Sequence, residues 1–341
     1  MKKFLSFTFL FLLVSCNLTD KKKDKVWSEL PEVTSLSTLK ETEFAETLEN
    51  PITNDKNTIY APAFLFAWDK VEEELKSSIK LDTSNTNNFK LVVASKSYLN
   101  SLLDTEYSAS AINDNGRIIA KAFFNKTLPF ETKLQALDDP ILFEKKTNVS
   151  AFGMKYFDED AIKFSKILYY LNDEIFILQL TPKDKQHEII LIKGLENFTT
   201  LAGAIAQTNN LIEKGKTESK DNKQSWKYEI VEKDIFSIPT IKFNIATSYK
   251  NLVGQQFLTT DNKKHFIEEA YQRTGFILNE NGAVVESAAV AAVDSASAEP
   301  IIKHPKSMIF DKPFLIVIKR KEQINPYFVM TINNAELLTK K

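Results

Sequence analysis

The chain has 341 residues, enough to bury a large core, and its 44 Lys and Arg residues nearly balance its 45 Asp and Glu residues. The net charge of −1 gives no basis for binding nucleic acid through bulk charge. One cysteine and three histidines exclude an intrachain disulfide and a Cys/His metal cluster. The 25 phenylalanines, against 8 glycines and 11 prolines, predict an ordered, aromatic-rich core.

The N-terminus has the pattern of an export signal. Met1-Lys2-Lys3 precedes an apolar run over residues 4–14 that is too short to span a bilayer. The run ends in Leu13-Val14-Ser15-Cys16, which resembles the bacterial lipobox, whose cysteine is lipidated and becomes the first mature residue. We expect a lipoprotein signal peptide at residues 1–15 and a lysine-rich tether at residues 16–26. A plain secretory signal with a chance cysteine is the alternative.

This pattern predicts where the protein resides. Acylation of Cys16, palmitate included, would hold an exported protein at the bacterial cell envelope, at the outer membrane or the cell surface. The lysines of the tether are expected to be solvated, although they could also contact anionic headgroups. The anchor would use the chain's single thiol, which argues against a cysteine protease.

Hydrophobic periodicity predicts the elements of the first half of the chain. Residues 27–49 predict a helix, with leucines and Phe44 near one face, and a turn at Pro51 comes after it. An apolar strand that starts at Thr58 then enters a helix that ends near Ile79. Beyond it we expect a strand at residues 89–94, a helix at 97–103 and a central sheet strand at 118–126.

The second half of the chain is predicted to be mostly strands. Alternating or continuous apolar runs separated by polar turns indicate β structure, and one amphipathic run indicates a helix. The strands are expected at residues 149–156, 161–172, 174–180, 188–193, 235–245, 265–269 and 274–278, the helix at 195–214, and a charged connection at 215–224.

Small and β-branched residues fill the stretch 282–293, which comes after a turn at Asn281 and contains no proline. With a period of two, one face holds only small or β-branched residues, and the other holds the carboxylates Glu286 and Asp294. A strand with one buried face fits this pattern, and an Ala/Val helix or a linker is the alternative. The face without carboxylates consists of Ala283, Val285, Ser287, Ala289, Ala291 and Val293.

The residues after this stretch resemble the C-terminal end of the serpins. Phe310-Asp311-Lys312-Pro313-Phe314 and Pro326-Tyr327-Phe328-Val329-Met330 are similar to the two strands that close that fold. The segment from Ile235 to Ile245 is similar to an earlier serpin strand. The resemblance implies a single α+β domain at residues 27–341, with large mixed and antiparallel sheets and an exposed reactive loop at about residues 282–305. Between Ile79 and Ile118 the resemblance fails, because the chain is too short there for the family's helices and strands, so we expect a reduced helical layer. Ala61 and Ala63 stand where the family prefers serines that bridge strands beneath the sheet.

The resemblance implies a function as a monomeric inhibitor of a serine protease. A serpin loop is cut by its target, and the freed hinge then inserts into a sheet as an added strand. Loop length predicts a cut at Ala296-Ser297, suited to an elastase-like or subtilisin-like protease, and Ala298, Ile301 and Ile302 are alternatives. A non-inhibitory serpin-fold envelope lipoprotein, acting as a binding or structural module, is the competing hypothesis. The predicted hinge comprises Gly282, Ala283, Val285, Glu286, Ser287, Ala288 and Ala289.

Motifs of enzyme chemistry are absent from the sequence. It contains no phosphate-binding glycine loop, no His-Glu-x-x-His and no Gly-x-Ser-x-Gly, so we expect neither an enzyme nor a cofactor. His187, His265 and His304 are predicted to be solvated surface histidines. The acidic runs at residues 138–139 and 158–160 are predicted to be solvated turns, with oxygen ligation of a cation as the alternative.

Overall fold

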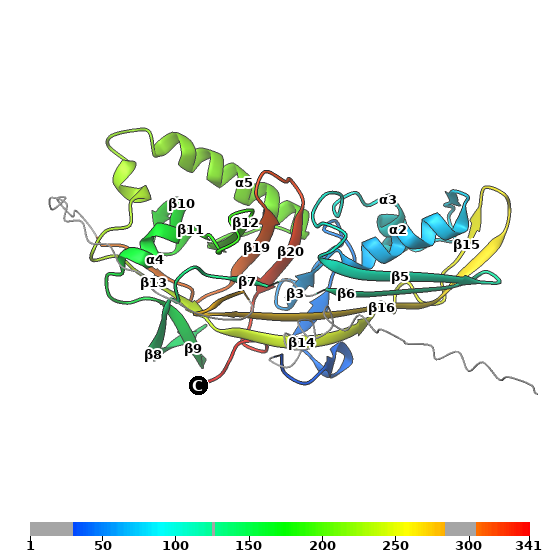
Figure 1. Ribbon diagram of the computed structural model, residues 1–341, viewed down its shortest axis with the longest axis horizontal. Coiled ribbons are helices and arrows are strands. Elements are labelled where there is room, and N and C mark those ends of the chain that lie inside the picture. The colour runs from blue at the N-terminus through cyan, green and yellow to red at the C-terminus, as the bar shows by residue number, and fades with distance from the viewer. Residues whose placement is uncertain (1–29, 125–126, 284–304) are drawn as a thin grey trace, which may run out of the picture.

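The computed structural model describes residues 30–124, 127–283 and 305–341. In these ranges it is an elongated α+β structure, in which large sheets carry most of the ordered backbone and few helices cover them (Figure 1). The predicted α+β class, with large mixed sheets and few helices, is therefore confirmed. None of the helices in these ranges is long and apolar enough to cross a membrane.

The largest sheet, called the long sheet below, is built around β16 (Lys264–Asn279), which runs along most of the molecule in Figure 1. β6 (Arg117–Phe124) pairs with β16 in parallel on one side, and β14 (Ile241–Ser248) pairs antiparallel on the other. The remaining strands are β5 (Tyr107–Asp114) beside β6, β1 (Thr34–Ser35) beside β14, β15 (Gln256–Thr259) and β4 (Ile79–Lys80) toward the start of β16, and β7 (Leu128–Pro129) and β17 (Gly282–Ala283) at its end.

A second sheet, called the central sheet, supplies much of the core. Its strands are largely apolar, and every residue of β20 is buried, as expected for strands covered on both faces. Phe276 of β16 stacks on Phe328 of β20 with ring centroids 4.3 Å apart, which joins the two sheets. The order is β10 (Ser165–Asn172), β11 (Ile175–Leu180), β12 (His187–Lys193), β19 (Phe314–Arg320), β20 (Pro326–Ile332), β3 (Asn57–Tyr60) and β2 (Thr42–Phe44).

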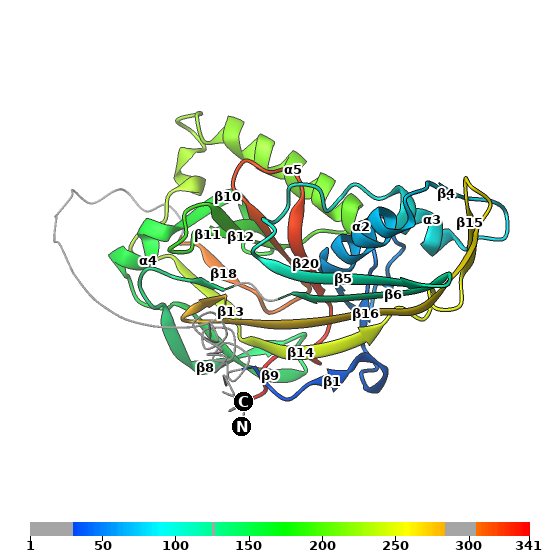
Figure 2. The same ribbon diagram turned by 45° about the vertical axis from the view of Figure 1, so that its right-hand side comes forward.

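A third, smaller sheet lies beside one end of the long sheet. In this small sheet β18 pairs in parallel with β13, and β13 pairs antiparallel with β9 (Figure 2). Gly153 of β9 has a φ of +155°, which L side chains rarely adopt, and a Cβ there would overlap the carbonyl oxygen of Phe236. The order is β18 (Ser307–Ile309), β13 (Ile235–Pro239), β9 (Thr147–Met154) and β8 (Gln135–Phe143).

Few helices cover these sheets. α2 (Ala63–Leu75) packs on the inner face of the long sheet against β5 and β6 and buries Phe64, Trp68 and Val71. α5 (Leu201–Glu218) lies over β10. The shorter helices are α3 (Asn87–Ala94), α4 (Glu159–Phe164) and the 3₁₀ turns η1 (Leu36–Thr38) and η2 (Ser225–Tyr228).

Several predictions about local structure are wrong because side-chain caps and distant partners override periodicity. The helix predicted at residues 27–49 is replaced, from residue 30 on, by β1, η1 and β2, since the first of these strands pairs with β14 and the last with β3. The strand predicted at 89–94 is helix α3, whose N-cap Thr86 accepts a hydrogen bond from Phe89 N. Residues 97–103 form turns instead of a helix, and β5 was not predicted.

Other errors concern where elements begin and end. The strand predicted at 161–172 starts only at Ser165, because Asp158 caps α4 by accepting from Asp160 N and Ala161 N. The helix predicted at 195–214 starts at Leu201, after its N-cap Thr200. It continues to Glu218, into the predicted charged connection.

Two of the predicted surface histidines are buried. His187 is fully buried at the start of β12, where its Nδ1 lies 2.9 Å from the Tyr327 hydroxyl and its Nε2 3.3 Å from Asp184. His265 stacks on Phe257, and burial lowers the pKa of its imidazole. Sheet pairing buries both rings despite their charged neighbours in sequence. His304 lies outside the described residues.

Candidate functional site

The candidate site consists of the strands on either side of residues 284–304, the segment that holds most of the predicted reactive loop. β17 is the N-terminal stem of this segment, and β18 with Lys306 is its C-terminal stem. β17 pairs antiparallel with the end of β16 on one side and with β7 on the other. The first two predicted hinge residues thus already occupy a strand position within the long sheet.

Gly282 allows the backbone to enter the sheet between β16 and β7. Its φ is +122°, and a Cβ there would lie 2.4 Å from the carbonyl oxygen of Leu128 and 2.7 Å from Phe130 N. The adjoining turn is held by hydrogen bonds from Phe130 N to Asn281 O and from Leu134 N to Glu280 O. Ala283 comes next, with its side chain buried at 1% exposure, as its predicted inward parity requires.

The contact between β6 and β16, called the seam below, continues from this point along the sheet. The eight paired positions run from Arg117–Phe266 to Phe124–Thr274. Beyond Thr274, the same strand pairs with β17 at Leu278. A strand that extended β17 along β16 would therefore have to enter the seam and separate β6 from β16.

A buried glutamine lies beneath the seam. Gln272 of β16 is fully buried, its Oε1 accepts a hydrogen bond from Phe64 N in the first turn of α2 (2.9 Å), and its Nε2 donates to Thr274 Oγ1 (2.9 Å). Ala61 and Ala63 nearby are buried and bring no hydroxyl. The sheet strand itself therefore supplies the polar bridge to α2 here, which no pattern in the sequence predicted.

The C-terminal stem is held by a buried ion pair. Lys306 Nζ lies 2.8 Å from Asp234 Oδ2, and both side chains are almost completely buried, at 2% and 0% exposure. Asp234 Oδ1 also accepts a hydrogen bond from Lys306 N (2.7 Å). The ammonium group donates to Trp226 O and lies 5.6 Å from the centre of the Trp226 ring.

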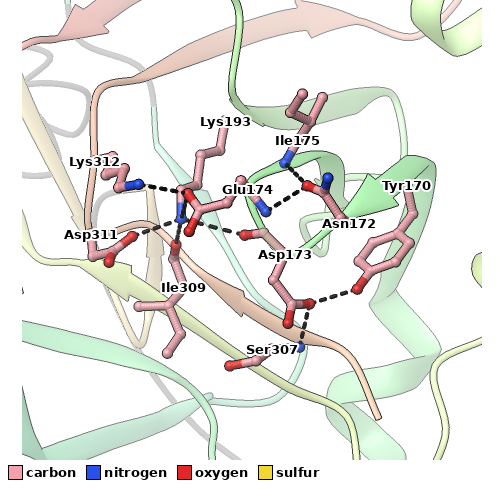
Figure 3. A network of polar contacts seen from close by, with 10 residues as sticks. All are labelled: Tyr170, Asn172, Asp173, Glu174, Ile175, Lys193, Ser307, Ile309, Asp311 and Lys312. Atoms are coloured by element: carbon pink, nitrogen blue, oxygen red, sulfur yellow. Dashed lines mark hydrogen bonds and ion pairs between the residues drawn. The ribbon is translucent and has the colours of Figure 1, made fainter. Parts of the chain in front are cut away.

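A second lysine fastens the residues that come after Lys306 (Figure 3). Lys193 Nζ, at the end of β12, contacts Asp311 Oδ1 at 2.7 Å and Ile309 O at 2.8 Å. The turn between β10 and β11 adds Asp173, whose carboxylate accepts from Ser307 N at 2.8 Å and from the Tyr170 hydroxyl. This Lys193 network ties β18 to the central sheet.

Ionisation in the Lys193 network depends on its contacts. Burial, and then the hydrogen bond to Asp173, raises the pKa of Tyr170, so the phenol stays neutral and donates. The hydrogen bond from Lys312 lowers the pKa of Glu174. The ion pair of Glu174 with Lys312 is exposed and stabilises the fold only slightly. This stabilisation is fully present above the ordinary pKa of a glutamate and is lost as the pH falls through the lowered pKa of Glu174.

Most of the predicted site residues are not described by the structure. The reactive bond at Ala296-Ser297, its alternatives at Ala298, Ile301 and Ile302, and the lipid anchor Cys16 lie outside the described residues. The same holds for hinge residues 285–289.

In the described ranges, no group of three or more His, Cys, Asp or Glu side chains could hold a metal ion. Among the acidic residues considered for a cation, Asp139 pairs with Lys155, Asp158 caps α4 and Asp160 pairs with Lys163.

No family model matches this sequence, and no curated protein does. Among solved structures, the chain is similar to a serpin from the trematode Schistosoma haematobium, at 10% identity and a TM-score of 0.39, over 64% of this chain and 56% of that one. It is also similar to the native thermophilic serpin tengpin, at 14% identity and a TM-score of 0.36, over 64% and 55%. A serpin of the insect Tenebrio molitor matches at 12% identity and a TM-score of 0.39, over 82% and 92%. In the first two, the match spans little more than half of the solved chain.

These solved structures belong to the family that the C-terminal motifs resemble. The architecture also has the predicted order of elements, from the sheet strand β6 through β16 and the glycine turn to the closing strands β19 and β20. The predicted order of these strands along the chain is therefore confirmed.

Proposed function

We propose that this protein is a membrane-anchored inhibitor of a serine protease, which cuts the segment 284–304 and is trapped when the freed hinge inserts into the seam. The observation that carries the proposal is the position of β17. Gly282 and Ala283 lie between β16 and β7, at the end of the seam, as the beginning of an added strand. A strand added between two others gains backbone partners on both sides.

The register of β17 supports insertion of the residues after it. Continuing the pairing of Ala283 with Leu278 would bring Ala289 opposite Gln272. Because the pairing with β6 skips Glu268, residue 293 would then lie opposite Ile267, near the far end of the seam. Gln272, Thr274 and Leu278 face the buried side of the sheet. The small, uncharged face of residues 283–293 would therefore point inward, and the carboxylates of Glu286 and Asp294 would point to solvent.

The length of the segment that would insert supports the preferred cut site. If residues 284–294 fill the seam, a cut at Ala296-Ser297 releases enough chain to insert. Small residues on both sides of this bond suit an elastase-like or subtilisin-like protease. Attachment through Cys16 would hold the inhibitor at the bacterial cell envelope, where foreign proteases reach it.

Replacing Ala289 by glutamate is expected to convert the inhibitor into a substrate. The carboxylate would have to enter the buried side of the seam opposite Gln272, where an unpaired charge costs several kcal/mol. Insertion would be slowed relative to deacylation, so the protease would cut the loop and leave. The measurement is the fraction of protease in a detergent-stable covalent complex, assayed with elastase, subtilisin and other serine proteases.

Ala288→Glu is the matched control, because the same carboxylate would lie on the solvent side, across from Arg273. This variant is expected to form the complex as the unaltered protein does. If the unaltered protein forms no complex with any protease in the panel, the inhibitory function is wrong. The competing hypothesis, a non-inhibitory envelope lipoprotein with the same fold, would then replace it.

A further inference from the structure

We infer that the seam is closed from outside by a clasp that sets how readily the sheet opens, an inference that rests on the proposed function for its biological role. The clasp consists of Arg117, Lys121 and Phe123 on β6 and Glu268, Glu269 and Tyr271 on β16. These residues lie on the solvent face of the long sheet, and α2 packs on the opposite face.

A β-bulge in β16 builds the acidic half of the clasp. The pairing with β6 shifts between Ile267 and Glu269, so that Glu268 is an extra residue in β16. In a regular strand, adjacent side chains point to opposite faces, and a bulge changes this alternation. As a result, the consecutive residues Glu268 and Glu269 both reach solvent, at 38% and 37% side-chain exposure.

Each glutamate meets a cation from the other side of the seam. The Arg117 guanidinium binds the Glu268 carboxylate with two hydrogen bonds of 3.0 Å, a bidentate geometry with defined direction. Lys121 Nζ lies 2.8 Å from Glu269. Further along, the rings of Phe123 and Tyr271 are in contact, with centroids 6.1 Å apart.

All three contacts cross the path that an inserting strand would take. They join β6 to β16 and to no other strand, so they must break when those strands separate. The inner face of the seam holds the small residues Ala120, Ala122 and Ala270 along most of its length, and the buried pair Ile118 and Ile267 near its end. The clasp adds ion pairs and a ring contact between the two strands on the outer face.

The experiment measures seam opening by hydrogen exchange in the uncleaved protein, so it needs neither a protease nor insertion. In the double variant Glu268→Gln/Glu269→Gln, peptides covering β6 and residues 266–274 are expected to exchange roughly three- to thirtyfold faster, as for two exposed ion pairs lost together. Glu73→Gln is the matched control, since it removes an exposed Lys70–Glu73 pair that lies within α2. This variant should leave the hydrogen-exchange rate of the seam peptides unchanged.

A charge swap tests the pairing itself. Arg117→Glu/Glu268→Arg retains a pair across the seam and is expected to exchange close to the original rate. If the hydrogen-exchange rate of the seam peptides is unchanged in the double glutamine variant, the clasp inference is wrong. It is also wrong if peptides of the central sheet accelerate as much as those of the seam. If exchange accelerates as expected but no variant gains thermal stability after loop cleavage, the clasp holds and the proposed inhibitory function is wrong.

Discussion

Cleavage within residues 284–304 is expected to raise the melting temperature of a truncated form that starts after Cys16 by roughly 20 °C or more. An inserted strand of about eleven residues would form backbone hydrogen bonds with both β6 and β16, each contributing about 1 kcal/mol. In a chain of this size, each kcal/mol of added stability raises the melting temperature by roughly 2 °C, so a total of about 10 kcal/mol gives the expected rise. The measurement is a thermal melt before and after limited proteolysis with elastase or subtilisin.

The control is the cleaved Ala289→Glu variant, in which insertion should stop before the residues opposite Gln272. Its melting temperature is expected to rise much less after the same cut. A cleaved protein that melts at the same temperature as the intact one would show that residues 284–294 do not add to the long sheet. The inhibitory mechanism would then be wrong, and the fold would stand.

Replacing Asp234 by alanine is expected to destabilise the protein by about 3–5 kcal/mol, because it leaves the buried Lys306 ammonium without its carboxylate. The variant also removes the carboxylate that accepts hydrogen bonds from the backbone amides of Lys306 and Val231. These hydrogen bonds hold the C-terminal stem in place. Trp226 lies against the Lys306 ammonium and therefore reports this region directly. Urea denaturation followed by tryptophan fluorescence measures the shift of the midpoint.

Asp139→Ala is the control for this variant. Asp139 pairs with Lys155 on the surface at 76% exposure, and such pairs contribute less than about 1 kcal/mol. The two aspartates have the same type of partner, so the difference between them measures burial. If both variants unfold at the same urea concentration, the ion pair of the C-terminal stem has no special role in stability.

Patterns of period two predicted most of the sheets correctly. β6, β9, β13, β14, β16, β19 and β20 lie where alternating or continuous apolar runs place them, because the side chains of a strand alternate between faces whatever its partner. Gly282 was predicted as the hinge glycine from the resemblance to the serpins, in which a glycine marks the start of the hinge. Its φ of +122° and its contact with Leu128 explain why no other residue fits there.

Contacts distant in sequence could not be predicted in this way. The residues of β1 and β2 have helical periodicity, but they pair with β14 and β3, and that pairing decides their conformation. His187 has charged neighbours in sequence, yet sheet pairing and the Tyr327 hydroxyl place it in the core. Local composition carries no information about such partners.

The resemblance of the C-terminal motifs to the serpins predicted the α+β class and the order of the closing strands, and a period of two predicted which residues of the stretch 282–293 share a face, because these features are local. How the seam and the C-terminal stem are held became clear only from the folded chain. Gln272 meets Phe64, Arg117 meets Glu268, and Lys306 meets Asp234 across separations of 72 to 208 residues. Such polar pairs form because folding brings their strands and helices together, and no local pattern encodes them.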